Sequence, residues 1–271
     1  MIKNITIKNI IFTISIVLII CIVFLVKNIV VYGKGKSFGS VKLVTEYDDN
    51  TTIDEMETVT FGSYPQLDAS GSKKKPIEWI VLDRKGNRAL LLSKYILDCK
   101  CYNKEYKDIT WETCYLRRWL NNDFYYQAFD SNEQNKIKTT NVINNNNIDY
   151  GTNGGNNTKD KIFCLSIEEI RRYFGNGIKE GYGYQLGKKV ATKGTVYAMS
   201  VDNNGYNLYV YGGSGESEYN WAIGNSTFWL RSPGNDLNAS AFVLFIGHLD
   251  MAGFIVDSPR LGVRPALWVS Y

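Results

Sequence analysis

Alternating apolar and polar residues predict short β-strands along much of the chain after residue 57. Residues 58–64 (TVTFGSY) alternate and stop at Pro65. Residues 77–82 (IEWIVL) and 89–92 (ALLL) flank a polar stretch that contains Gly86, which is the pattern of a β-hairpin. Because both segments are almost wholly apolar, we expect both strands to face the core.

Three- and four-residue spacing predicts short helices in the middle of the chain. An apolar stripe behind Thr110 indicates one helix, and it consists of Tyr115, Leu116, Trp119 and Leu120. Two later helices are predicted by capping boxes, in which a Ser side chain and an acid or amide three residues on satisfy free backbone N–H groups. The pairs are Ser131 with Gln134, and Ser166 with Glu169 in a helix that ends at Gly175.

From residue 195 onward, short apolar runs alternate with Gly and Asn turns. Strands are expected at residues 196–201, 207–211, 227–230, 241–246, 253–256 and 263–269. Residues 141–161 carry two Asn-rich runs and too few apolar residues to pack by themselves, so they are expected to form a loop that either binds a ligand or is mobile. The class is therefore α+β, with short early helices and a mainly antiparallel late sheet.

A different pattern opens the chain, because residues 10–26 contain no charged side chain. Seventeen residues at about 1.5 Å rise each approach the ~30 Å hydrocarbon thickness of a bilayer. Residues 10–32 are therefore expected to form one membrane helix, with Lys27 reaching the headgroups. The alternative is a cleaved signal peptide, although the apolar run is long and only residues 31–33 offer a poor cleavage site.

These patterns divide the chain into a membrane anchor (1–33), a polar juxtamembrane linker (34–56) and a folded α+β domain (57–271). Lysines flank both sides of the apolar run, so their distribution does not decide the orientation. A short basic tail before the first apolar segment is the usual layout of an export signal. We therefore expect a single-pass protein in the cell membrane with its C-terminal domain outside the cytoplasm.

Charge argues against a nucleic-acid partner. The formal net charge is +4, but three lysines lie in the first 33 residues without an acid, so the remainder carries 28 basic and 27 acidic side chains. The folded domain is thus nearly neutral and has no basic excess for binding phosphates.

The cysteines of the domain are expected to be buried free thiols. A domain of this size folds without disulfide bridges, and the C-K-C spacing differs from that of zinc or thioredoxin sites. The four residues are Cys99, Cys101, Cys114 and Cys164.

Sequence motifs give no catalytic, metal or cofactor site. The Gly-Lys-Ser at residues 35–37 lacks the upstream glycine of a phosphate-binding loop, and residues 212–216 (GGSGE) lack the last glycine of a nucleophile elbow. His248 is the only histidine, and we expect it to be an exposed loop residue. The balance is therefore against an enzyme, without excluding one.

Six ordered blocks of the sequence resemble an uncharacterised family of Gram-positive surface proteins, a domain of unknown function. They are FGSYPQ (61–66), IEWIVL (77–82), LRRWLN (116–121), KDKIFCLSIEE (159–169), WLRSPG (229–234) and GVRPALWV (262–269). The family is in turn distantly similar to the C-type-lectin-like fold that it shares with sulfatase-modifying factors. This resemblance implies that the first and last strands, around residues 60–64 and 265–269, lie in one sheet.

The same resemblance limits the function. Sulfatase-modifying enzymes depend on late cysteines, and this chain has none after Cys164. Calcium-dependent lectins carry paired tripeptides, whereas this chain has only Gly234-Asn235-Asp236 without a partner motif. The Asn- and Asp-rich turns at 202–205 and 235–238 are therefore more simply explained as turns than as calcium ligands.

Candidate ligand-binding residues cluster around the WLRSPG block. Trp229 and Arg231 alternate on one strand and share a face, which suits stacking and hydrogen bonding to a ligand. The alternative is that Arg231, like Arg264, ties a loop backbone down inside the fold. The full candidate set is Tyr219, Trp221, Trp229, Arg231, Asn235, Asp236 and Asn238.

Together these features predict a membrane-anchored extracytoplasmic binding or interaction domain whose ligand is a glycan or a protein. The alternatives are a cell-envelope enzyme of unrecognised chemistry and a purely structural surface module. An exposed aromatic cluster would favour binding, and two convergent titratable groups in a cleft would favour catalysis.

Overall fold

The computed structural model describes residues 36–200, 207–213 and 217–271. Residues Phe38–Tyr271 form one compact unit. The expected membrane span, residues 10–32, and the whole 202–205 turn lie outside the described residues. Within the described ranges, no helix is long and apolar enough to cross a membrane.

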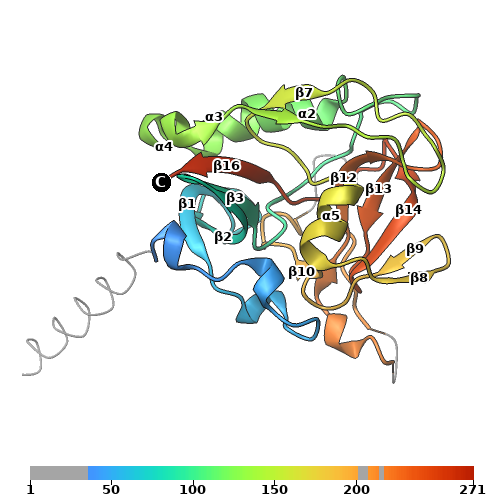
Figure 1. Cartoon of the computed structure of the whole chain (residues 1–271), viewed down its shortest axis with the longest axis horizontal. Coiled ribbons are helices and arrows are strands. Elements are labelled where there is room, and N and C mark those ends of the chain that lie inside the picture. Colours follow the sequence, from blue (N-terminus) through green and yellow to red (C-terminus); the bar gives the residue numbers. More distant parts are fainter. Residues whose placement is uncertain (1–35, 201–206, 214–216) are drawn as a thin grey trace, which may run out of the picture. The chain divides into compact units, whose positions relative to one another are not determined.

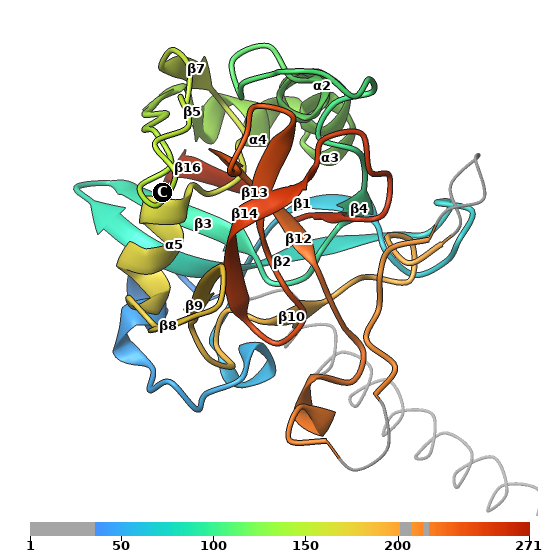
Figure 2. The same cartoon turned by 90° about the vertical axis from the view of Figure 1, so that its right-hand side faces the viewer.

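Two mainly antiparallel sheets form the framework of this unit (Figures 1 and 2). The first has five strands in the order β1 (Val59–Pro65), β2 (Lys74–Lys85), β3 (Arg88–Ser93), β16 (Ala266–Ser270) and β5 (Ile137–Lys138). The second has seven, in the order β4 (Asp98–Cys99), β15 (Gly262–Val263), β12 (Phe228–Pro233), β13 (Ala239–Val243), β14 (His248–Ile255), β9 (Gly183–Gln185) and β8 (Ile178–Glu180). All neighbouring strands are antiparallel except the pair β12 and β15.

Short helices and two small ladders complete the described part of the domain. The helical segments are η1 (Phe38–Ser40), η2 (Val44–Glu46), η3 (Ile53–Glu55), α2 (Tyr115–Trp119), η4 (Leu120–Phe124), α3 (Tyr125–Ala128), α4 (Ser131–Lys136), α5 (Ile167–Phe174) and η5 (Asn220–Ala222). The ladders pair β6 (Thr140–Val142) with β7 (Thr158–Asp160), and β10 (Thr192–Lys193) with β11 (Asn225–Ser226). The fold is α+β and mostly sheet, as the sequence predicts.

The predicted β2–β3 hairpin is confirmed. Its strands pair antiparallel from Trp79 opposite Ser93 to Lys85 opposite Arg88. Gly86 in the turn has φ of 59°, a left-handed conformation that glycine adopts without steric cost. Trp79 is fully buried and donates from Nε1 to the Phe61 carbonyl at 2.6 Å, which holds the hairpin against β1.

The first and last strands lie in one sheet, as the resemblance implies, although β2 and β3 separate β1 from β16. Figure 1 shows α2, α3 and α4 in a row beside β16, and α5 between the β2–β3 hairpin and the second sheet. The helix expected from the 115–120 stripe is present and continues through one π-helical turn, Leu120–Phe124, into α3.

Capping explains where two helices begin. The Ser166–Glu169 capping box is present, and α5 ends at Gly175, whose φ is 100°. At α4 the expected Ser131–Gln134 pair is wrong by one residue, because Asp130 is the N-cap and Glu133 completes the box. Both pairs fit the motif in sequence, and Asp is at least as good an N-cap as Ser.

Residues 38–56 pack on the domain, whereas the sequence predicts a linker over 34–56. Four side chains of this segment belong to the core, namely Val41, Val44, Ile53 and Met56. Arg84 of β2 also donates from Nε to the Phe38 carbonyl at 3.0 Å. The apolar residues are too widely spaced to show a period in sequence, because Val44 and Ile53 sit on separate 3-10 turns and Val41 and Met56 lie outside these turns.

The expected strand at 196–201 is not formed by its described residues. Residues 195–199 form turns instead, with Met199 N–H bonded to the Thr195 carbonyl at 3.0 Å. Likewise, residues 207–211 contribute one isolated bridge, between Val210 and Ser226, instead of a strand.

A fragment of residues 36–271 should fold by itself, because the described core lies entirely after residue 40. We expect one cooperative unfolding transition, followed by Trp fluorescence in guanidinium chloride and by far-UV circular dichroism. Transitions that fail to coincide, or a fragment that remains aggregated, would contradict this prediction.

Candidate functional site

Trp229 and Arg231 lie inside the domain. Trp229 is 0% exposed and donates from Nε1 to the Lys100 carbonyl at 2.8 Å. Arg231 is 3% exposed, and its guanidinium donates to the Cys164 carbonyl at 2.9 Å and to the Ile143 carbonyl at 3.0 Å. Neither side chain presents a face to a ligand, so the placement matches the structural alternative.

Arg231 connects three separate parts of the chain. Besides the two carbonyls, its Nε donates to Asn144 Oδ1 at 3.1 Å, and its NH1 forms an ion pair with Glu169 of α5. Glu169 also caps the helix by accepting from the Ser166 N–H at 3.0 Å. The guanidinium therefore joins β12, the N-terminus of α5 and the start of the Asn-rich loop, and its contact with Glu169 is a pairing of opposite charges.

Arg264 has a related role between β15 and β16, where the chain passes from the second sheet to the first. It is 1% exposed and donates to the carbonyls of Ser93 at 2.9 Å and Val190 at 2.8 Å. Burial lowers the pKa of its guanidinium to about 9, which still leaves the group charged at neutral pH. The charge is held by backbone carbonyls and by the face of Phe228, 5.1 Å from the guanidinium carbon.

The other candidates do not form one site. Tyr219 and Trp221 are half-buried near η5, whereas Asn235 and Asp236 are exposed and Asn238 is half-buried in the β12–β13 turn. The six residues of β12 separate these two groups by about 20 Å of extended chain. Trp221 lines a small pocket of about 160 Å³ with Asp54 and Lys193, which form an ion pair at 2.9 Å.

The Asn-rich loop, residues 141–161, is fixed by its own amides. Asn147 is 1% exposed, and its Nδ2 donates to the carbonyls of Pro233 and Met251 at 2.9 and 2.8 Å. Asn144 donates from Nδ2 to the Asn156 carbonyl at 2.8 Å. The buried amides satisfy backbone groups that would otherwise lack partners, so this loop serves the fold.

The structure brings together a different set of residues, which we call the basic cleft. It has a volume of about 330 Å³ and lies where β2, β3 and β16 meet α5 and β6. Strand register explains it, because Asp83, Leu90, Trp268 and Lys138 are successive partners across four strands and so share one face of the sheet. The neighbouring row on the same face contains Lys85 and Arg88.

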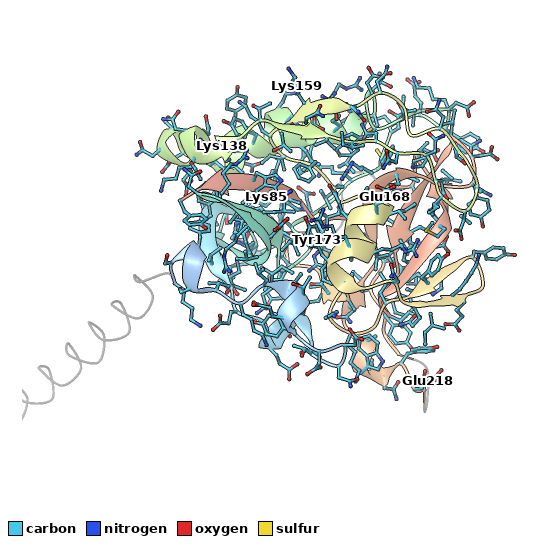
Figure 3. All side chains as sticks on the ribbon, viewed as in Figure 1. Lys85, Lys138, Lys159, Glu168, Tyr173 and Glu218 are labelled. Carbon is cyan, nitrogen blue, oxygen red and sulfur yellow. The ribbon has the colours of Figure 1, made fainter. Side chains whose placement is uncertain are left out.

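Cations surround the half-buried Trp268 ring. Lys85 Nζ lies 5.5 Å and the Arg88 guanidinium carbon 6.0 Å from the ring centroid. Arg172 of α5 lines the cleft from the other side. Figure 3 shows Lys85 and Tyr173 close together on this side of the domain, with Lys138 beyond them.

Acidic groups compensate these cations only in part. Asp83 lies 3.9 Å from both Lys85 Nζ and an Arg172 nitrogen, at the outer limit of an ion pair. Glu169 lines the cleft, but its charge is already matched by Arg231. The arrangement of Lys85, Arg88 and Arg172 with one weakly paired carboxylate therefore favours an anionic ligand.

The Tyr173 side chain also lines the basic cleft. Burial, together with the neighbouring Asp83, raises the pKa of Tyr173 well above its usual range, so the phenol stays protonated. It donates to Asp83 Oδ2 at 3.3 Å. In the described ranges, no group of three or more His, Cys, Asp or Glu side chains is placed to hold a metal ion.

His248 and the cysteines also lack catalytic surroundings. His248 begins β14 and is half-buried, not exposed as expected, and burial lowers its pKa. Cys101, Cys114 and Cys164 are free thiols, and Cys99, Cys114 and Cys164 are buried. Burial raises the pKa of Cys114 to about 12 and moves the pKa of Cys164 upward as well, so neither is a thiolate at neutral pH.

Sequence reasoning missed the basic cleft because its residues come from five segments. Each segment carries an ordinary signal: Lys85 and Arg88 flank a turn, and Trp268 alternates with buried Leu267 and Val269. That alternation does put Trp268 on the outer face of its strand, and this is the one signal in the sequence that points to it.

Substitution of Arg231 should lower stability. Arg231→Met in the 36–271 fragment would leave Glu169 and two buried carbonyls without their donor, and we expect the free energy of unfolding to fall by about 3 kcal/mol. Asn235→Ala, at an exposed turn position, should change it by less than about 0.5 kcal/mol. Equal effects in guanidinium titrations would contradict the structural role of Arg231.

Alkaline pH should destabilise the domain through its buried thiols. Between about pH 9 and 12 the thiol of Cys114 ionises only in the unfolded chain, so the unfolded state binds fewer protons and stability falls as pH rises. From pH 8 to 10 the loss should be about 1.4 kcal/mol for this group. Cys114→Ser keeps the acceptor for the Arg117 N–H, and its unfolding free energy should decline less over that range. If the unfolding free energies of Cys114→Ser and the wild type fell equally from pH 8 to 10, the loss could not be assigned to the Cys114 thiol.

The comparisons with known proteins agree with an uncharacterised family. A family model described as a domain of unknown function, DUF6273, matches residues 86–271, which include α2 to α5, all of the second sheet, and β3, β5 and β16 of the first. No curated protein and no solved structure matches the chain. Because the match covers more than half of the sequence, the chain belongs to the DUF6273 family of domains of unknown function.

Proposed function

We propose that the domain is a binding module and that the basic cleft takes an acidic saccharide. The observation that carries this proposal is the set of three cations that line the cleft with the half-buried Trp268, namely Lys85, Arg88 and Arg172. They are opposed by one weakly paired carboxylate, Asp83. Sugar rings stack on aromatic faces, and carboxylates pair with Lys and Arg. One ligand that carries both a ring and an acid group would use both features of the cleft.

The shape and polarity of the cleft support a saccharide over a small inorganic anion. Besides Trp268, its lining includes Thr139, Thr140 and Asn141 on one edge, where hydroxyl and amide groups can bond to sugar hydroxyls. A volume of about 330 Å³ lies within the range of ligand-binding sites, at its lower end. The protonated Tyr173 supports binding over acid–base catalysis.

The setting of this function is also part of the proposal. The uncharged run at residues 10–26 supports a membrane anchor spanning 10–32, with the domain outside the cytoplasm. The common sheet of β1 and β16 supports the C-type-lectin-like assignment within a Gram-positive surface-protein family. In this setting the cleft would meet acidic polymers of the cell envelope or its surroundings.

Binding can be tested with oligogalacturonate, whose rings each carry a carboxylate, and with a neutral malto-oligosaccharide of equal length. For the full chain in phosphatidylcholine nanodiscs, calorimetry should show binding of the acidic oligomer that weakens with added salt. Arg88→Gln and Trp268→Leu should each weaken it about tenfold, equivalent to about 1.4 kcal/mol. Labelled oligomer should also be retained by intact cells that express the wild type, because the cleft is proposed to face outward.

Lys159→Gln provides a matched control, since Lys159 is an exposed cation on β7 that does not line the cleft (Figure 3). It should leave binding unchanged. Equal affinity for the neutral oligomer, or equal losses in Lys159→Gln and Arg88→Gln, would overturn the proposal. If the acidic oligomer bound the protein in nanodiscs but labelled oligomer was not retained by intact cells, only the outward orientation would be overturned.

A further inference from the structure

The second sheet carries a separate apolar cavity of about 300 Å³. Its walls include Phe242 of β13, Phe254 of β14, and Phe245 and Leu261 from the segments that follow these strands. Phe242 and Phe254 meet edge to face, with centroids 6.0 Å apart. None of its residues belongs to the basic cleft, so this site is independent of the proposed saccharide binding.

The cavity is open to solvent at aromatic positions. Phe254 and Tyr209 are each 45% exposed, which is unusual for large apolar side chains that lie side by side around one depression. Tyr211 stacks on Phe245 with centroids 4.3 Å apart and braces that wall. An apolar ligand entering here would remove exposed aromatic surface from water.

Two polar features limit the kind of ligand. The Thr227 side chain lines the cavity, the residue is 4% exposed, and its Oγ1 has no hydrogen-bond partner within the described part of the chain. A buried hydroxyl without a partner is costly, so a ligand that supplies one would be stabilised. Arg260 is exposed and also lines the cavity, where it contacts the Tyr209 ring at 6.0 Å and forms no ion pair among the described residues.

We propose that this cavity binds an acyl chain whose carboxylate pairs with Arg260. The aromatic and leucine walls accept the hydrocarbon, Arg260 supplies the opposite charge at the solvent boundary, and Thr227 supplies one hydroxyl. A peptide fits less well, because each of its residues brings an N–H and a C=O, and the lining offers few groups to satisfy them. The site therefore takes a fatty carboxylate.

Octanoate is a suitable probe, because it is water-soluble and carries both features. The full chain in phosphatidylcholine nanodiscs would be titrated with octanoate, octylammonium and butyrate, and heats from empty nanodiscs subtracted. We expect octanoate to bind at least tenfold more tightly than octylammonium, which has the wrong charge, and than butyrate, which lacks four methylene groups. No octanoate heat above the blank at millimolar concentration would overturn the proposal.

Three variants locate the binding. Arg260→Gln should weaken octanoate at least fivefold, and Leu244→Trp, which fills a cavity-lining position, should abolish binding. Arg118→Gln is the matched control, because Arg118 is an exposed arginine on α2 away from the cavity, and it should bind like the wild type. Should Leu244→Trp fail to fold, the comparison of the two Arg→Gln variants still decides.

Other outcomes also decide the ligand. Equal binding of octanoate to Arg260→Gln and Arg118→Gln would overturn the carboxylate contact. Tighter binding of a leucine-rich peptide than of octanoate would overturn the acyl assignment in favour of a protein partner. Oligogalacturonate should not compete with octanoate, and competition would show that the two sites are not independent.

Discussion

The domain depends on buried arginines that donate to main-chain carbonyls. Arg231 lies on β12 of the second sheet and Arg264 lies between β15 and β16, and each fixes segments far apart in sequence. A carbonyl in a connecting segment cannot be satisfied by a strand neighbour, and leaving it buried without a donor is expensive. A guanidinium has five N–H groups in a fixed plane, so one side chain satisfies several such carbonyls at once. This geometry allows long connecting segments to be buried without leaving their carbonyls unsatisfied.

This network also determines where ligands can bind. Because Arg231 neutralises the charge of Glu169, the acid of α5 that lines the basic cleft, the cleft keeps a net positive charge. Two of the remaining cations, Lys85 and Arg88, flank the β2–β3 turn, where both residues are exposed. The ion pair between Arg231 and Glu169 thus affects the net charge of the basic cleft.

Local patterns in the sequence predicted local structure well. The β2–β3 hairpin and the Ser166 cap depend on residues within one turn or one strand pair, and both are present. The cleft and the packing of residues 38–56 could not be predicted, because they depend on which distant strands become neighbours. Trp268 becomes part of a site only through its register with Leu90 and Lys138, and that register is fixed by the whole sheet. Conversely, the WLRSPG block has the sequence pattern of a binding site, but its Trp and Arg are buried. A Trp and an Arg on one face of a strand suit an interior contact as well as a ligand contact.

The buried thiols have a consequence for the order of events during biogenesis. In the native domain Cys114 and Cys164 are shielded and protonated, so exchange with external disulfides is slow. An unfolded chain has no such shield, and in an oxidising compartment its thiols can pair wrongly before the core closes. If the domain is exported as proposed, it must fold faster than its thiols are oxidised. A chaperone or reductant that delays disulfide formation would then raise the yield of folded protein without altering the final structure.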